Sequence, residues 1–100
     1  MAKKQVIWTK TSIAELENIL QFYIDRNDSV KYSSWLFSEF EKRIEIISFH
    51  PKIGRKTDLS QFRIFPFKNF GIIYKETPET IFIESIWDFR QNPMNRMDQK

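Results

Sequence analysis

The spacing of apolar residues divides the chain into a short strand, two helices and three further strands. Residues 5–9 form a β-branched and aromatic run that is typical of a strand. Apolar residues then recur every three or four positions through residue 24, which predicts an amphipathic helix. A second stripe of this kind predicts a helix over residues 29–49. Pro51 ends it, because the residue before proline avoids the α conformation.

Polar residues near both helix starts predict how these helices begin. Ser12 and Glu15 fit the capping-box pattern, in which a serine hydroxyl and a glutamate carboxylate satisfy amides at the start of a helix. We therefore expect the first helix to open at Ser12. Ser29, in the polar break between the helices, offers an N-cap to the second. Two amphipathic helices joined by so short a break form an antiparallel hairpin, whose apolar side must cover another layer.

Three strand-like runs follow, at residues 62–67, 70–75 and 80–88. Their short connections predict consecutive antiparallel pairing. Pro66 cannot donate to a ladder, which predicts an edge position or a bulge. The expected fold class is α+β: an N-terminal strand, then a two-helix antiparallel hairpin packed on a mainly antiparallel four-stranded sheet. We expect one domain over residues 1–93 and a polar C-terminal tail over residues 94–100.

Composition removes several classes of function. The chain has 100 residues, enough for one core, and no cysteine, so it offers no disulfide or thiolate site. No run approaches the roughly 18 apolar residues of a membrane span, and we expect a cytoplasmic protein without a membrane partner. Glycine-rich phosphate loops, metal-ligand clusters and catalytic triads are absent from the sequence, so we expect no cofactor and no metal. The only histidine, His50, is expected to interact with the last carbonyls of the second helix.

The positive charge is concentrated in one quarter of the chain. The net charge is +3, yet residues 51–75 hold six basic residues and a single acidic one, Asp58, for a local net charge of +5. A polyanion is the natural partner for such a segment. The alternative is a solvated, lysine-rich surface that keeps the protein soluble.

In this order and spacing, the elements resemble the RelE/ParE superfamily of toxins from type II toxin–antitoxin systems. The resemblance covers residues 5–93. Four motifs carry it: Pro-Lys-Ile-Gly-Arg at 51–55, Phe-Arg-Ile at 62–64, Phe-Gly-Ile-Ile-Tyr at 70–74 and Trp-Asp-Phe-Arg-Gln-Asn-Pro at 87–93. The resemblance implies a cognate antitoxin, with a segment that is disordered alone and folds on docking, contributing acidic side chains and an apolar helix.

The resemblance also implies candidate catalytic residues. Ribonuclease members cut mRNA on the ribosome by 2′-hydroxyl attack, which needs positive charge at the phosphate and a group that handles protons. Arg63 and Arg90 are the candidates for phosphate binding, and Asp88 stands where many members have a histidine. Gly71 stands where many members have an arginine. The structural alternatives are ion pairs, Arg63 with Glu84 and Arg90 with Asp88.

Other basic residues are expected to follow a nucleic-acid backbone. These candidates are Lys52, Arg55, Lys56 and Lys68. Gly54 together with Arg55 also fits a turn, in which case the basic side chains are secondary, and an isolated lysine is often simply solvated.

The resulting hypothesis is a toxin that inhibits growth by ribosome-dependent mRNA cleavage, with the ribosome and mRNA as partners and no metal requirement. One alternative is a non-enzymatic inhibitor of DNA gyrase. Another is a domain that has lost toxicity and binds its antitoxin. Whether the chain is an enzyme stays open at this point. The nuclease hypothesis requires Arg63 and Arg90 to meet on one open face of the sheet, and a one-residue register slip would reverse either side chain.

Overall fold

The computed structural model describes residues 3–90. Its elements are β1 (Gln5–Trp8), α1 (Lys10–Asn27), α2 (Lys31–Phe49), β2 (Arg55–Lys56), β3 (Phe62–Phe67), β4 (Phe70–Glu76) and β5 (Thr80–Asp88). The predicted tail at residues 94–100 and the end of the last motif, residues 91–93, lie outside the described residues.

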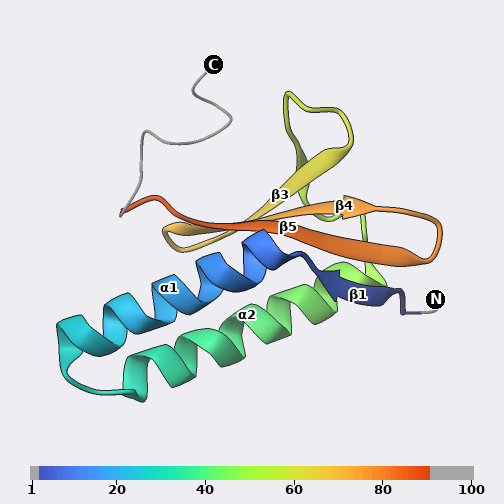
Figure 1. Cartoon of the computed structure of the whole chain (residues 1–100). Helices are drawn as coiled ribbons and strands as arrows, with labels where there is room; N and C mark the ends of the chain where they lie inside the picture. The colour runs from blue at the N-terminus through green and yellow to red at the C-terminus, as the bar shows by residue number, and fades with distance from the viewer. Residues whose placement is uncertain (1–2, 91–100) are drawn as a thin grey trace.

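The strands form one five-stranded sheet in the order β1-β5-β4-β3-β2. β1 is parallel to β5, and the other neighbours are antiparallel. The two helices run as an antiparallel hairpin along one face of this sheet (Figure 1). The predicted α+β class is confirmed, but the sheet gains a fifth strand, β2. A strand of two residues has no periodic pattern from which it could be predicted.

The predicted start of α1 is wrong. Thr9 is the N-cap, and its hydroxyl oxygen accepts from the Ser12 amide at 3.1 Å. Ser12 is buried, and its own hydroxyl donates back to the Thr9 carbonyl at 2.9 Å. Glu15 turns to the sheet, where its carboxylate accepts from the Ser85 hydroxyl at 2.7 Å and the Ile86 amide at 2.9 Å. Glu15 thereby fixes α1 to the place where the pairing of β4 and β5 shifts register.

The second helix also starts later than expected. It begins at Lys31, whose amide donates to the Ser29 hydroxyl oxygen at 3.1 Å, so Ser29 lies before the helix and not at its cap. At the other end the backbone amide of His50 donates to the carbonyls of Ile46 and Ile47. The expected contact with the last helical carbonyls is thus made by the backbone of His50.

The core lies between the helix hairpin and the sheet. Its side chains come from one stripe of each helix and from alternate positions of β4 and β5. The fully buried members are Leu36, Phe40, Ile47, Phe70, Ile72, Tyr74, Ile81 and Ile83. Within residues 3–90, neither helix has the length and apolar character needed to cross a bilayer.

The proline of β3 lies where that strand becomes an edge. β2 pairs only with Arg63 and Ile64, so the stretch of β3 that contains Pro66 has a neighbour on the β4 side alone. The edge position expected for Pro66 is confirmed, and its missing amide costs the ladder nothing there.

Candidate functional site

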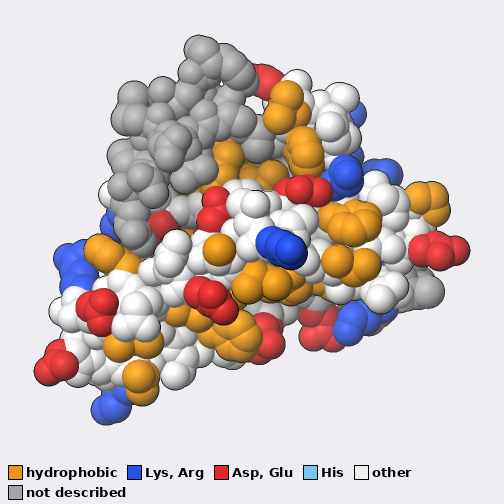
Figure 2. Space-filling model, in the orientation of Figure 1, with side chains coloured by type: hydrophobic (Ala, Val, Ile, Leu, Met, Phe, Trp, Pro, Cys, Tyr) orange, Lys and Arg blue, Asp and Glu red, His pale blue; other side chains and the backbone are white. Residues whose placement is uncertain are grey.

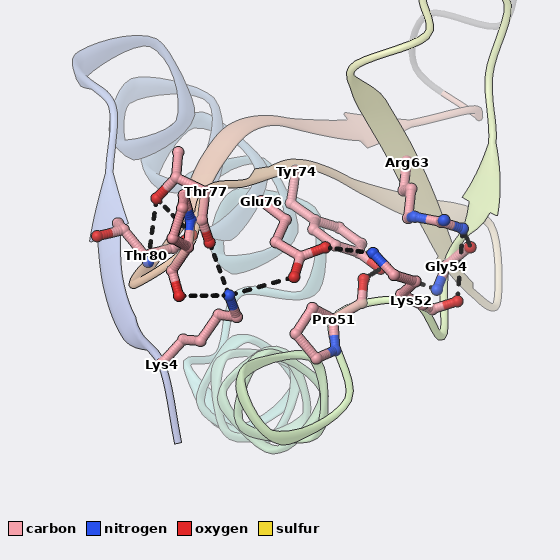
Figure 3. Close-up of polar contacts among 10 residues, drawn as sticks. Lys4, Pro51, Lys52, Gly54, Arg63, Tyr74, Glu76, Thr77 and Thr80 are labelled. Carbon is pink, nitrogen blue, oxygen red and sulfur yellow. Dashed lines mark hydrogen bonds and ion pairs between the residues drawn. The ribbon is translucent and has the colours of Figure 1, made fainter. Parts of the chain in front are cut away.

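Arg63 points toward the connection between α2 and β2 (Figure 3). It lies directly opposite Tyr74, which places both side chains on the face that carries the helices. Its Nη1 donates to the Gly54 carbonyl at 2.8 Å and to the Lys52 carbonyl at 3.4 Å. The alternative, a cross-strand ion pair with Glu84, is not formed: the Arg63 guanidinium binds these carbonyls, and the Glu84 carboxylate lies 3.9 Å from the ammonium of Lys75.

Tyr74 contacts the same connection from within the core. Its side chain is fully buried, and its hydroxyl donates to the Pro51 carbonyl at 2.7 Å while accepting from the Gly54 amide at 2.8 Å. Burial raises the pKa of Tyr74, and the Gly54 amide and the Arg63 charge oppose that shift only in part. Arg63 and Tyr74 together fix residues 51–54 on the edge of the sheet.

Lys52 belongs to a chain of charges around Glu76 (Figure 3). The Glu76 carboxylate lies 3.0 Å from the ammonium of Lys52 and 3.2 Å from that of Lys4. Lys4 also donates to the carbonyls of Thr77 and Pro78, each at 2.7 Å. Burial acts to raise the pKa of Glu76, but the hydrogen bonds from Lys52 and Lys4 outweigh it, so the pKa is lowered.

This lowered pKa makes the protein sensitive to acid. A carboxyl group whose pKa is lower in the folded state adds stability above its unfolded pKa of about 4.3, and that contribution is lost as the pH falls through the folded value. We expect Glu76→Gln to be less stable than wild type at pH 7 and to match it near pH 3. Urea unfolding at both pH values measures the difference. The matched control is Glu79→Gln, an exposed carboxylate in the connection that follows Glu76. A stability difference between Glu76→Gln and wild type that is as large at pH 3 as at pH 7 would refute the assignment.

Asp88 and Arg90 lie at the other end of the sheet. Asp88 is 4% exposed, and its carboxylate accepts from the Tyr23 hydroxyl at 3.0 Å, from Asn69 Nδ2 at 2.8 Å and from the Arg90 amide at 3.0 Å. Burial raises the pKa of Tyr23, and the hydrogen bond to Asp88 adds to this effect. Asp88 therefore anchors three parts of the fold to one another.

The two arginines are not brought together. Arg63 lies opposite Tyr74 and Asp88 lies opposite Phe70, so the two sites are separated by four residues of β4, about 13 Å along the strand. Arg90 lies beyond Asp88, farther from Arg63 still. The arrangement that the nuclease hypothesis requires, two guanidinium groups on one open face, is not the one observed.

The face of the sheet opposite the helices has an apolar centre. A Cβ built on Gly71 would lie 2.8 Å from Cδ1 of Ile64 and 3.5 Å from the Phe89 ring, so these side chains fill the space above the glycine. Trp87, which pairs with Gly71, packs edge-on against Phe89 with ring centroids 5.7 Å apart. Arg55 and Lys56 lie at the rim of the shallow pocket formed here.

Lys68 lies away from that rim, in the turn between β3 and β4. Its backbone has φ = 56°, and its ammonium lies 5.3 Å from the centre of the Trp35 ring. The four predicted nucleic-acid contacts therefore fall in three places: Lys52 in the Glu76 cluster, Arg55 and Lys56 on the open face, and Lys68 at the end that holds Arg90.

Among residues 3–90, the predicted catalytic residues are engaged in contacts within the fold. Arg63 is hydrogen-bonded to carbonyls, Asp88 is buried among donors, and His50 ends α2 with Pro51 between it and Lys52. Within residues 3–90, no three histidine or acidic side chains are grouped so as to hold a metal ion.

Comparison with known proteins shows the family of the chain. The family model for the ParE toxin of the type II toxin–antitoxin system parDE matches residues 6–93. The chain belongs to the ParE toxin family. Such a system implies a cognate antitoxin as partner. A solved structure of the chromosomal ParDE toxin–antitoxin system from P. aeruginosa shares the fold, with a TM-score of 0.73 at 15% identity over 84% of this chain and 94% of that chain. No curated protein sequence matches.

Proposed function

We propose that this ParE-family toxin inhibits DNA gyrase by binding and performs no RNA cleavage. The observation that carries the proposal is the apolar character of the face of the sheet opposite the helices. Where many relatives of the superfamily have an arginine, this chain has Gly71 covered by Ile64 and Phe89. An apolar centre with a charged and polar rim, here Arg55, Lys56 and Asp58, is typical of a protein-binding surface. The match to a ParE model supports the same choice over ribosome-dependent cleavage.

The test compares DNA damage with mRNA damage. The chain is expressed from a tightly controlled promoter, and purified protein is added to gyrase with relaxed plasmid. We expect broken chromosomal DNA and loss of supercoiling, with mRNA intact. Rapid mRNA cleavage that Arg63→Ala abolishes would overturn the proposal in favour of the nuclease. Absence of toxicity in several hosts would overturn it in favour of a domain that only binds its antitoxin.

The same experiment can locate the gyrase contact. Arg55 is exposed on the rim, where a charge reversal leaves the core unchanged. We expect Arg55→Glu to weaken gyrase inhibition by about tenfold, which corresponds to about 1.4 kcal/mol of binding energy. Lys10→Glu, at the start of α1 on the helix side, is the matched control.

The antitoxin is proposed to cover a second surface, the groove between α1, α2 and β1. Hydrophobic side chains reach the surface over these elements (Figure 2). The groove is lined by Trp8, Ile13, Leu20 and Phe37, with both acidic and basic residues at its rim. An amphipathic helix places apolar side chains on one face, and such a groove accepts it.

Phe37 is the residue to change, because it lines this groove and is 40% exposed. We expect Phe37→Glu to remain folded and to lose co-purification with the product of the neighbouring antitoxin gene. Phe22→Glu, a comparably exposed aromatic outside the groove, should keep the complex. A Phe37→Glu complex as stable as that of wild type would refute this docking site.

A further inference from the structure

Three basic side chains from distant parts of the chain converge on one depression at the end of the molecule. Arg26 comes from the last turn of α1, Lys68 from the turn between β3 and β4, and Arg90 from the segment just after β5. Figure 1 shows these three segments at the same end of the fold. The hydroxyl-bearing rings of Tyr23 and Tyr32 complete the lining, together with Asn27.

Among residues 3–90, the lining of the depression carries basic side chains and no acidic one. None of the ion pairs within this range uses Arg26, Lys68 or Arg90. The Asp88 carboxylate nearby is 4% exposed and already accepts from three donors. Asp25 and Asp28 flank Arg26 and Asn27 in the sequence, but neither lines the depression. The described part of the lining therefore carries three cations and no carboxylate.

The backbone of Lys68 supplies a second, independent observation. Lys68 is the first residue of a two-residue hairpin turn and has φ = 56°, in the left-handed region. Glycine, asparagine and aspartate are preferred at such positions, because a lysine side chain there is strained. A strained residue at a surface turn points to a role for its side chain. Its contact with Trp35 keeps the ammonium at this end of the molecule.

We propose that Arg26, Lys68 and Arg90 bind the phosphodiester backbone of DNA. Guanidinium and ammonium groups donate hydrogen bonds to phosphate oxygens and neutralise their charge, so three such groups can contact successive phosphates of one backbone. Tyr23 donates its only hydroxyl proton to Asp88, so this proton is already used within the fold. The basic side chains are therefore the groups that contact the phosphates. This inference rests on the proposed function, since gyrase holds DNA and a bound toxin would lie beside it. The cluster is separate from the apolar face proposed to contact gyrase.

The experiment measures DNA binding without gyrase, so that each proposal can fail alone. A fluorescein-labelled 20-base-pair duplex is titrated with purified full-length protein, and anisotropy is recorded over a range of salt concentrations. Each neutralised phosphate contact contributes about −0.9 to the slope of log K against log salt. We expect Arg26→Gln, Lys68→Gln and Arg90→Gln each to reduce the slope by about 1, with about tenfold weaker binding in the triple variant.

Lys68→Gly is the sharpest variant. Glycine suits the left-handed backbone, so this change should keep the Tm of the protein while it weakens DNA binding as much as Lys68→Gln does. Lys10→Gln removes an equal charge at the opposite end of α1, about 24 Å away along the helix, and should leave binding unchanged. Absence of duplex binding at low salt, or equal losses in all variants including Lys10→Gln, would overturn the proposal.

A competing ligand is an acidic protein segment. Unlabelled decaglutamate is therefore titrated against the same complex and against the three single variants. We expect it to displace the duplex poorly, because a duplex holds about one negative charge per 1.7 Å of its axis in a fixed array, whereas a flexible polyglutamate must be ordered on binding. If decaglutamate binds as tightly as the duplex and loses affinity in the same variants, the site is one for acidic peptides and the DNA proposal is wrong.

Discussion

Replacing Gly54 by alanine is expected to destabilise the toxin by roughly 2–4 kcal/mol, because a methyl group has no room there. A Cβ at this position would lie 2.6 Å from the Tyr74 hydroxyl, 2.8 Å from its ring and 3.0 Å from the Ile64 carbonyl. Tyr74 is fully buried and cannot move aside. The hydrogen bonds that it makes to Pro51 and Gly54 would be lost with the displacement.

Thermal unfolding measures this effect, and a drop in Tm of about 10 °C or more is expected for a domain of this size. Gly71→Ala is the matched control, since the Cβ there would meet only the flexible end of Ile64 and the Phe89 ring. Tyr74→Phe should cost less than Gly54→Ala, and the double variant should cost less than the sum, because the phenol oxygen is the closest obstacle. A Gly54→Ala protein with the Tm of wild type would contradict this account.

Gly54 also shows what sequence patterns could not predict. Its position after a helix and before a basic strand fits a turn, yet the structure holds it at a negative φ, where its lack of a side chain matters for space alone. The neighbour that requires this space, Tyr74, is twenty residues away in the chain. Contacts across such a separation depend on sheet register, which local periodicity does not determine.

The direction of Arg63 was unpredictable for a related reason. β3 has apolar residues on both faces, with Ile64 toward the open side and Phe65 and Phe67 toward the core. In such a strand apolar and polar residues do not alternate, so the sequence does not indicate which face of the sheet the Arg63 side chain occupies. The two long helices and three long strands were predicted with ends within about three residues of those observed, because their periodicity is strong. β2, with two residues and both exposed, has no such pattern.

A contact between residues far apart in the chain also explains why the start of α1 was predicted wrongly. The capping box places Glu15 on the first amides of the helix, but the carboxylate instead satisfies the Ile86 amide at the irregular pairing of β4 and β5. The buried Ile86 amide lies beyond the end of β1, which pairs with β5 only as far as Ile83, so it needs another acceptor, and Glu15 is the one that the fold provides. Glu15 therefore makes this tertiary contact instead of the capping-box contact, and Thr9 is the N-cap of α1.

Asp88 stands at the position where a catalytic group was expected, and its contacts predict a structural role. Asp88→Ala would leave the Tyr23 hydroxyl, the Asn69 amide and the Arg90 amide without their acceptor. Each buried donor left unsatisfied costs about 1–3 kcal/mol, and because some of these groups reach water we expect a total loss of about 3 kcal/mol. Asp88→Asn keeps one acceptor oxygen and should lose less, and Tyr23→Phe, which removes a single bond, should lose least.

Urea unfolding at pH 7 gives the stability of each variant, and gyrase inhibition is measured in parallel at a temperature where all of them are folded. If Asp88 only holds α1, the β3–β4 turn and the end of β5 together, Asp88→Asn inhibits gyrase as well as wild type once folded. Loss of inhibition in a fully folded Asp88→Asn would instead place the carboxylate in the working surface of the toxin. The free energies of unfolding add a second criterion. A structural role for Asp88 requires Tyr23→Phe and Asp88→Asn to be intermediate in stability between wild type and Asp88→Ala, whereas a catalytic or contact role does not.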